Sequence, residues 1–289
     1  MAVPAWKQRP RVLLAAPRFA LPETVGEALA ALAERPEAVV VAGGTEVMPD
    51  LLWRIRGAAG FVSLRRVAGL RGLARQDGEL VIGAGTPVAA LTTVADAGLR
   101  AAASSLGTPL VRTEATIGGN VVSALPYRNL LPTLLASGAT LELSSATGTR
   151  TVPFDGFITA PGRTRLAEGE LLTAVRLPAH TGFADYTKVG RRNAQFVATV
   201  SAALVSRDGV ARLAFGNAGP TPLRSDDVDA AATALLDGQA ARADLQAAVA
   251  AAVDPPEDAV ASADYRRHAL GVLAVRLVTR AAVDAGMGS

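Results

Sequence analysis

The chain has 289 residues, of which 50% are hydrophobic and 4% aromatic, and its formal net charge at pH 7 is +3. That length is enough for two or three packed units, but the basic residues are scattered among acidic ones without interleaved aromatic side chains, so we expect no nucleic-acid partner. Because cysteine is absent, the chain by itself cannot form disulfides, thiolate zinc sites, iron–sulfur ligands or a cysteinyl flavin link.

The first residues carry basic side chains ahead of an apolar run at 12–17. This run is too short for a signal peptide, and Pro17 breaks it early. No run reaches membrane-spanning length, so we expect a cytoplasmic protein without a membrane partner. Residues 1–10 are expected to form a loosely held arm, and 11–15 a first short strand.

The predicted first unit spans residues 1–57. Apolar side chains at spacings of four and three predict a helix over 23–35, which Pro36 stops. Residues 39–42 predict a short buried strand, and helical spacing returns over 47–54.

A first glycine loop, Gly43-Gly44-Thr45-Glu46, joins that strand to that helix. Strand, glycines and helix in this order predict a phosphate site. The first free N–H groups of the helix and the positive end of its dipole would face an anion lying on Gly43 and Gly44.

The predicted second unit spans residues 58–179 and begins with a strand over 60–67. Asp77-Gly78 between two short apolar strands, 73–75 and 80–82, is the strongest hairpin signal in the chain. The next stretch, 83–88, approaches the dinucleotide-binding fingerprint, but a valine stands where the third glycine belongs. We interpret it as structural, with Thr86 as the N-cap of a helix and Pro87 at its first position.

A second glycine pair follows at Thr116-Ile117-Gly118-Gly119-Asn120, after predicted helices at 87–95 and 99–105 and a turn at 107–109. Adjacent glycines can take a positive φ and let the backbone lie against a ligand, and a polar residue stands on each side. A plain tight turn is the alternative. Two such loops in one chain are suited to the two halves of a dinucleotide pyrophosphate.

Beyond this loop, Asn129 is placed to cap a helix over 130–137 that Gly138 closes. A domain boundary is predicted at 179–182, and residues 180–289 predict a small antiparallel sheet covered by helices. The remaining predicted strands are 139–143, 150–152, 169–178, 183–189, 198–205 and 211–215, and the remaining predicted helices are 226–236, 240–252 and 265–285.

Four motifs in this order resemble one family. They are Ala42-Gly43-Gly44-Thr45-Glu46, Ile82-Gly83-Ala84, Thr116-Ile117-Gly118-Gly119-Asn120 and Lys188-Val189-Gly190-Arg191-Arg192. The chain resembles, over nearly its whole length, the FAD-binding medium subunits of the molybdenum hydroxylases, the xanthine dehydrogenase and carbon monoxide dehydrogenase flavoproteins. The resemblance implies an α+β fold of the vanillyl-alcohol-oxidase or PCMH type, with two α/β subdomains and the C-terminal domain, and it implies non-covalent FAD.

The resemblance also implies the residues that hold the cofactor. The two glycine loops would wrap the pyrophosphate, and Lys188, one of only two lysines in the chain, would stabilise the anionic reduced flavin beside the isoalloxazine. The implied FAD-binding positions are Val40, Val41, Ala42, Gly43, Gly44, Thr45, Glu46, Val47, Leu106, Thr116, Ile117, Gly118, Gly119, Asn120, Asn129, Leu172 and Lys188.

Two positions depart from the family pattern. Asn129 stands where the family carries an aspartate that bonds a ribose hydroxyl, and Gln195 replaces an aspartate after the paired arginines. An asparagine can still accept a hydrogen bond, so we expect binding to be retained. Drift within the family is one reading. A changed partner or electron acceptor is the other, because Tyr127-Arg128 could lie over the flavin.

Three functions remain open from the sequence. In the first, the chain passes electrons from a molybdenum-containing large subunit and an iron–sulfur small subunit, through FAD, to NAD, a quinone or oxygen. In the second, it is a stand-alone FAD-dependent oxidase or dehydrogenase. In the third, it is a non-catalytic binding or assembly module. We identify no catalytic residue and expect no metal site, since His180 and His268 are far apart in sequence.

Overall fold

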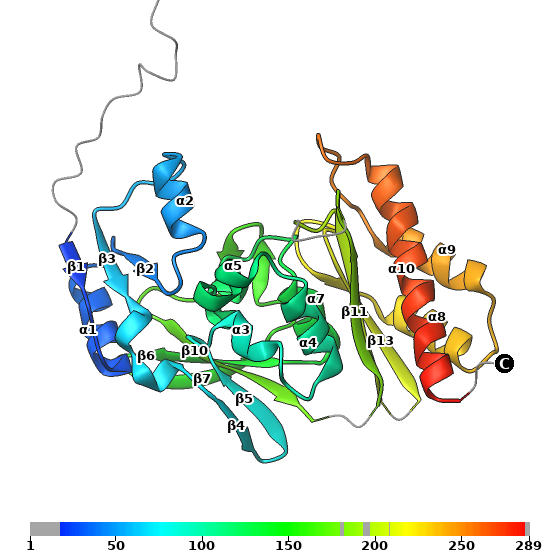
Figure 1. The fold of residues 1–289 in the computed structure, drawn as a ribbon, viewed down its shortest axis with the longest axis horizontal. Coiled ribbons are helices and arrows are strands. Elements are labelled where there is room, and N and C mark those ends of the chain that lie inside the picture. Colours follow the sequence, from blue (N-terminus) through cyan, green and yellow to red (C-terminus); the bar gives the residue numbers. More distant parts are fainter. Residues whose placement is uncertain (1–17, 180–181, 193–196, 208, 287–289) are drawn as a thin grey trace, which may run out of the picture.

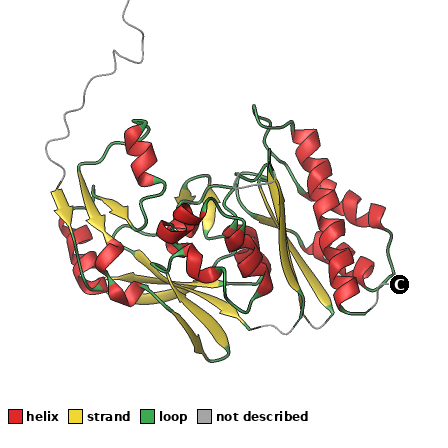
Figure 2. Ribbon diagram, viewed as in Figure 1, coloured by secondary structure: helices red, strands yellow, loops and turns green. Residues whose placement is uncertain are grey.

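The computed structural model describes residues 18–179, 182–192, 197–207 and 209–286. Three sheets follow one another in chain order along the long axis of the molecule, and helices cover them (Figures 1 and 2). The predicted α+β class is confirmed. The strand predicted at 11–15 lies outside the described residues, and the unit boundaries at 57/58 and 179/180 stay predictions.

The first sheet is small and parallel, in the order β1-β3-β2. Its strands are β1 (Arg18–Ala20), β2 (Val39–Val41) and β3 (Gly60–Ser63). Helix α1 (Val25–Glu34) begins after the Thr24 hydroxyl, which accepts from the N–H of Glu27, and its buried residues pack with those of β3. The strand predicted over 60–67 ends at Ser63, because two short 3-10 turns, η2 (Leu64–Arg66) and η3 (Ala68–Leu70), follow.

Helix α2 (Val47–Leu52) differs from α1 because it buries no residue. It projects from the body of the molecule (Figure 1). Leu52, Trp53 and Ile55, on and just after it, are all exposed. The first glycine loop is thus joined to a helix that buries none of its residues in a hydrophobic core.

The second sheet has five antiparallel strands in the order β4-β5-β10-β6-β7. The predicted Asp77-Gly78 hairpin joins β4 to β5, with Leu73 opposite Ile82. The strands are β4 (Leu73–Gln76), β5 (Glu79–Gly83), β6 (Thr140–Ser145), β7 (Gly148–Pro153) and β10 (Leu171–Pro178). A two-stranded ribbon that was not predicted, β8 (Ile158–Ala160) and β9 (Arg163–Thr164), lies before β10.

Helices of the second unit lie between the second and third sheets. Helices α4 and α7 contact the strands of the third sheet, and α6 contacts β5 and β10. Gly138, at φ +67°, closes α7 as predicted. The helices are α3 (Val88–Leu91), α4 (Ala97–Ser104), α5 (Pro109–Glu114), α6 (Ile117–Val122) and α7 (Leu130–Ala136).

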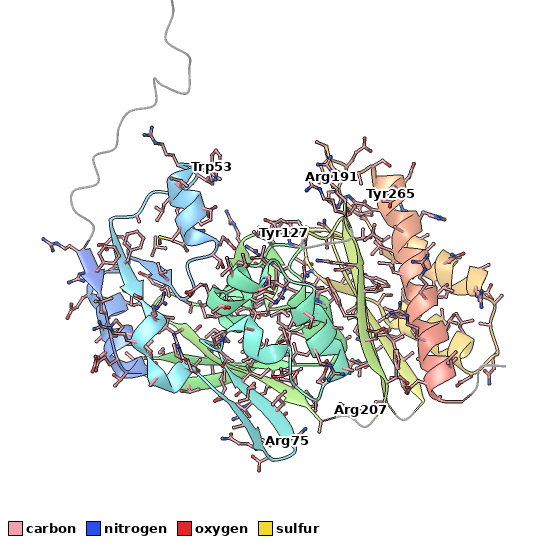
Figure 3. The ribbon with its side chains drawn as sticks, viewed as in Figure 1. Trp53, Arg75, Tyr127, Arg191, Arg207 and Tyr265 are labelled. Atoms are coloured by element: carbon pink, nitrogen blue, oxygen red, sulfur yellow. The ribbon has the colours of Figure 1, made fainter. Side chains whose placement is uncertain are left out.

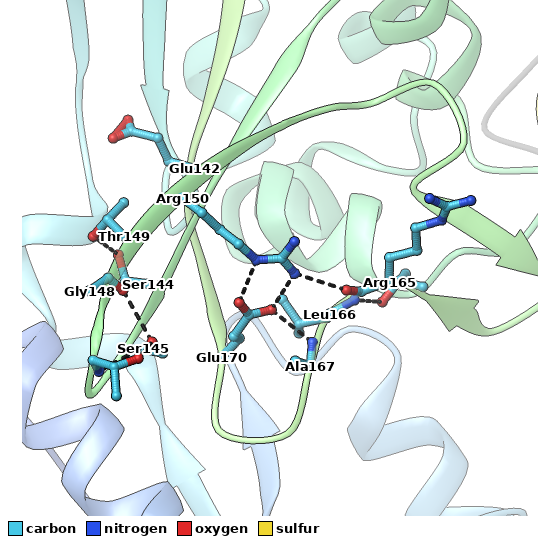
Figure 4. Close-up of polar contacts among 12 residues, drawn as sticks. Glu142, Ser144, Ser145, Gly148, Thr149, Arg150, Arg165, Leu166, Ala167 and Glu170 are labelled. Carbon is cyan, nitrogen blue, oxygen red and sulfur yellow. Dashed lines mark hydrogen bonds and ion pairs between the residues drawn. The ribbon is translucent and has the colours of Figure 1, made fainter.

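Strand β10 joins the first two cores. Leu171 belongs to the core under the first sheet, and Leu172 to the core of the second unit, because neighbouring side chains of a strand point to opposite faces. The loop before β10 is held by Arg150, whose guanidinium bonds the Glu170 carboxylate at 2.7 and 2.8 Å (Figure 4). This pair fixes the start of the strand that carries Leu172.

The third sheet is antiparallel, in the order β11-β12-β13-β14, and three helices lie on its outer face (Figure 1). The predicted strands and helices of this region are confirmed. They are β11 (Ala184–Val189), β12 (Val200–Arg207), β13 (Val210–Gly216), α8 (Asp226–Leu236), α9 (Arg242–Ala252) and α10 (Ala263–Asp284), with β14 (Leu223–Arg224) in addition. In the described part of the chain, no helix combines the length and the apolar content that crossing a membrane requires.

Candidate functional site

The first glycine loop leaves backbone donors open. Gly44 has φ +69°, which glycine adopts without strain, and α2 starts three residues later. Among the described residues, no hydrogen bond is made by the N–H groups of Gly44, Thr45 or Glu46. Three successive free donors next to a glycine bend are available to an anion. The phosphate site that the sequence predicts at this loop stays a prediction.

The second glycine pair has a different conformation from the one predicted. It is the first turn of α6 rather than a loop, with Thr116 as N-cap. Neither Gly118 nor Gly119 has a positive φ, so the prediction that both glycines bend the chain is wrong. The reason is capping: the Thr116 hydroxyl accepts from the N–H of Gly119 at 3.0 Å and so starts a helix.

The backbone donors of this turn are already used. The N–H groups of residues 117–120 all donate within the chain, to the carbonyls of Thr86, Ala84 and Thr116 and to the Thr116 hydroxyl. A Cβ on Gly118 would lie 2.7 Å from the Ala84 carbonyl oxygen, so this glycine allows close packing. Gly119 is exposed, and a Cβ there would approach only Thr116. One glycine therefore faces inward, and the other leaves an open face.

The two glycine segments lie against each other. An ideal Cβ on Gly43 would fall 1.9 Å from the carbonyl oxygen of Glu114 and 3.1 Å from the Cα of Ala115. These two residues directly precede Thr116. Helix α5, whose last residue is Glu114 and which was not predicted, thus brings the second segment up to the first. Only a glycine at position 43 permits this approach.

The stretch at 83–86 packs tightly inside the fold. A Cβ on Gly83 would lie 2.5 Å from the carbonyl oxygen of Leu70, and one on Gly85 3.0 Å from it. The prediction that Thr86 caps α3 is wrong, because its hydroxyl bonds the N–H and carbonyl of Gly72 at 3.0 Å instead. Pro87 occupies the N-cap position.

Arg128 connects the ends of the two glycine segments. Its Nε donates to the Ser123 hydroxyl, at the end of α6, at 2.8 Å, and its other guanidinium end is ion-paired with Glu46, at the start of α2. Burial lowers the pKa of Arg128 to about 10. The guanidinium lies 5.4 Å from the centre of the Tyr127 ring, whose own pKa is raised by burial and then by the charge of Asp50.

In the view of Figure 3, Tyr127 lies between Trp53, which directly follows the projecting helix α2, and Arg191, which follows β11. Asn129, the residue that follows Arg128, has a different partner. Asn129 stands at the N-cap position of α7, but its backbone is helical and it makes no capping bond, so the predicted capping role is wrong. Its buried amide donates to the Ser105 hydroxyl at 2.8 Å.

Lys188 also bonds Ser105. Its ammonium donates to the carbonyl of Ser105 at 2.6 Å, and burial lowers the pKa of the lysine. Strand β11 supplies Lys188, α7 follows Asn129, and Ser105 ends α4, directly before Leu106. The structure thus brings three predicted residues, Lys188, Asn129 and Leu106, from distant parts of the sequence to the region of Ser105.

Several other residues predicted to bind FAD lie in or beside the hydrophobic core. Ile117 and Leu172 are side chains of the same buried core, and Leu106 packs on its edge. Val40 and Val41 are half-buried in β2, directly before the first loop. The sequence did not single out Ser105 or Ser123, because no spacing rule links them to Lys188 or Arg128.

The cradle fits a dinucleotide in two further respects. The amide oxygen Oδ1 of Asn120 is buried and has no hydrogen-bond partner among the described residues, so a polar group of a ligand would satisfy it. Gly119 beside it leaves room for that ligand. Within the described ranges, no three His, Cys, Asp or Glu side chains gather where they could hold a metal ion. His180 and Gln195 lie outside the described residues.

This fold and this site define a flavin-binding chain of an oxidoreductase. The family model described as the FAD binding domain in molybdopterin dehydrogenase matches residues 15–180, and the one described as the CO dehydrogenase flavoprotein C-terminal domain matches residues 185–281. The chain belongs to this family of molybdopterin dehydrogenase flavoproteins, and FAD is its cofactor.

Individual relatives agree along the whole chain. The xanthine dehydrogenase FAD-binding subunit of Escherichia coli O157:H7 is 32% identical over 91% of this chain and 95% of its own. The carbon monoxide dehydrogenase medium chain of Hydrogenophaga pseudoflava is 31% identical over 92% of this chain and 97% of its own. A solved structure of carbon monoxide dehydrogenase from the same organism has a TM-score of 0.84 and 29% identity, and the match covers 93% of this chain and 97% of that one.

Proposed function

We propose that this chain is the FAD-binding subunit of a molybdenum hydroxylase complex and passes electrons from its partner subunits to NAD, a quinone or oxygen. The observation that carries the proposal is the contact between Gly43 and Glu114–Ala115, which brings the two glycine segments together. Relatives named as FAD-binding subunits or medium chains of dehydrogenases support it. A cytoplasmic location is part of the same proposal.

Within the cradle, we assign the diphosphate to the N–H groups of residues 44–46, which have no partner among the described residues and adjoin the bend at Gly44. The open face at Gly119 and the amide of Asn120 border the same ligand. The predicted positions from Val40 to Val47 and from Thr116 to Asn120 are therefore proposed as one binding surface. Leu106, Leu172 and Asn129 complete it from the core side.

When bound, FAD supplies the redox chemistry, accepting electrons and returning them singly or as hydride. The chain supplies charge and exclusion of water. Lys188, held at the Ser105 carbonyl, places a partly buried ammonium beside the proposed flavin ring, where a positive charge stabilises the anionic reduced form. The low polarity that lowers the lysine pKa also strengthens this interaction.

The proposed partners are a large subunit with the molybdenum cofactor, which oxidises the substrate, and a small iron–sulfur subunit, which relays the electrons. This division of labour is consistent with a chain that has no cysteine and offers no metal cluster among its described residues. NAD, a quinone or oxygen would be the acceptor.

Co-expression with the genes adjacent to this one tests the proposal. We expect the chain to elute with two further subunits, and the complex to show flavin and iron–sulfur absorption that bleach together when substrate is added. A yellow monomer or homodimer that oxidises a small molecule alone would instead establish a stand-alone oxidase or dehydrogenase. A colourless chain that takes up no FAD on reconstitution would establish a non-catalytic module.

A further inference from the structure

The charged side chains beside the cradle bear on how the diphosphate of FAD is held. The first loop ends in a carboxylate, Glu46, beside three free N–H groups, and a partly buried guanidinium, Arg128, is paired with it. We infer that Arg128 is the cation of the diphosphate site and that it exchanges the Glu46 carboxylate for the diphosphate when FAD binds. The inference rests on the assigned cofactor and is independent of the partner subunits.

The position of Arg128 supports this role. Its Nε is anchored at 2.8 Å to the Ser123 hydroxyl at the end of α6, while its other end reaches Glu46 at the start of α2. One side chain thus spans the two segments that form the cradle. The Tyr127 ring lies 5.4 Å from the guanidinium, close enough for a cation–π contact.

Electrostatics give the reason for an exchange. A diphosphate on the N–H groups of residues 44–46 brings negative charge next to Glu46, and like charges this close repel strongly in a partly buried site. The side chains of Arg128 and Glu46 are only 24% and 26% exposed, so water screens them weakly. If the guanidinium turns to the diphosphate, a charge-assisted bond replaces the ion pair. The Glu46 side chain, which is 26% exposed, can then be solvated.

The planar guanidinium suits both anions, because its fork of donors matches carboxylate and phosphate oxygens alike. Its pKa, about 10, keeps it charged at neutral pH despite burial. By contrast, Arg65 forms a neighbouring ion pair with Glu114 at 3.2 Å that is much more exposed, with side chains 68% and 45% accessible. That pair is a matched control: it lies beside the same glycine segments but does not span them.

Binding of FAD, ADP and riboflavin to the full-length apo chain tests the inference, because ADP carries the diphosphate and riboflavin does not. We expect Arg128→Met to weaken FAD and ADP by roughly 10- to 100-fold, the value of a charge-assisted bond. Riboflavin affinity should stay unchanged, and Arg65→Met should leave all three affinities as in the wild type. Equal losses for all three ligands in Arg128→Met would overturn the inference.

Glu46→Gln provides the second arm and carries the test if Arg128→Met does not fold. Removing the competing carboxylate should tighten FAD and ADP by about threefold, or ~0.65 kcal/mol, and should leave riboflavin unchanged. A weaker affinity for ADP in Glu46→Gln would show that the carboxylate holds the ligand itself, and would overturn the exchange. Wild-type chain that binds no FAD would overturn the proposed function instead, so the two failures are distinguishable.

Discussion

The two glycine segments have similar sequences, a Gly-Gly pair with polar neighbours, but they differ in backbone conformation and in hydrogen bonding. At the first, Gly44 takes a positive φ, and three N–H groups are left without partners among the described residues. At the second, both glycines are helical, and every N–H from 117 to 120 is bonded within the chain. A paired glycine can therefore either expose the backbone or allow it to pack.

The two segments also differ in the groups that supply positive charge to the site. On the first side, positive potential comes from backbone donors, which only a substitution by proline would remove. On the second side, where the backbone donors are used, the cations are side chains: Arg128 at the Ser123 hydroxyl and Lys188 at the Ser105 carbonyl. Single substitutions can therefore remove the charges of the second side selectively.

The largest effect is expected at Gly43, where the two segments meet. In Gly43→Ala, the new Cβ would lie 1.9 Å from the Glu114 carbonyl oxygen, so the segments must separate. We expect a loss of roughly 2–3 kcal/mol in stability and loss of FAD from the purified protein. The flavin-to-protein absorbance ratio and the thermal midpoint of the apo chain measure the two effects.

Gly57→Ala is the matched control, because nothing lies within 4 Å of the Cβ it would add. It should keep both FAD and stability. If Gly43→Ala also keeps its FAD, the two segments do not act as one cradle and their contact is incidental.

The second prediction separates the two glycines of α6. In Gly119→Val, the added Cβ approaches only the Thr116 hydroxyl, at 3.1 Å. We expect the branched side chain to occupy the proposed place of the cofactor, so FAD affinity should fall on the order of 100-fold, ~2.7 kcal/mol. In Gly118→Ala, the added Cβ meets the Ala84 carbonyl oxygen at 2.7 Å, so stability should fall by roughly 2 kcal/mol.

Flavin fluorescence titration and urea unfolding of both apo variants distinguish the outcomes. Gly119→Val should unfold within ~1 kcal/mol of the wild type, since valine is only a slightly poorer helix former than most residues. A Gly119→Val protein that binds FAD normally would contradict the proposed open face.

The sequence was sufficient where local chemistry decides the structure. The Asp77-Gly78 hairpin, the helix that Gly138 closes, and the strand-glycine-helix order at Gly43-Gly44 all depend on residues within a few positions of each other, and all are present. The main strands of the third sheet were also predicted from their apolar residues, whereas β1 of the first sheet was not predicted.

It was insufficient where one residue has two possible partners. Thr116 could flank a loop or cap a helix, and the cap prevails because Gly119 offers its N–H at 3.0 Å. Thr86 and Asn129 were assigned as caps, yet each bonds a residue brought close by folding, Gly72 and Ser105. Such long-range partners, like the bridge that Arg128 makes, leave no spacing signal.

The third prediction removes the deeper cation of the second side. Lys188→Met should keep FAD bound but lower the flavin midpoint potential by on the order of 30 mV, or ~1.4 kcal/mol for two electrons, because the reduced anion loses its counter-charge. Redox titration of the loaded protein measures this. An unchanged potential would remove Lys188 from the flavin site.

Lys188 also predicts a dependence of stability on pH. Burial lowers its folded-state pKa below the unfolded value, so charging it costs stability below the folded pKa, and this cost disappears as pH rises to the unfolded value. Between pH 8 and about 10.4, the unfolded lysine's ordinary pKa, the wild type should gain stability relative to Lys188→Met. Thermal midpoints of the two apo proteins at both pH values test the sign.

The smallest effect compares the threonines of the two segments. Thr116→Val removes the cap that accepts from Gly119, which should cost about 1 kcal/mol. Thr45 is exposed, and its hydroxyl makes no hydrogen bond among the described residues, so Thr45→Val should stay within ~0.5 kcal/mol of the wild type. Valine preserves the shape of both side chains, so the difference in urea midpoints isolates the cap. Equal losses would mean that the first segment is as tightly bonded as the second, and the contrast between an open and a closed backbone would be lost.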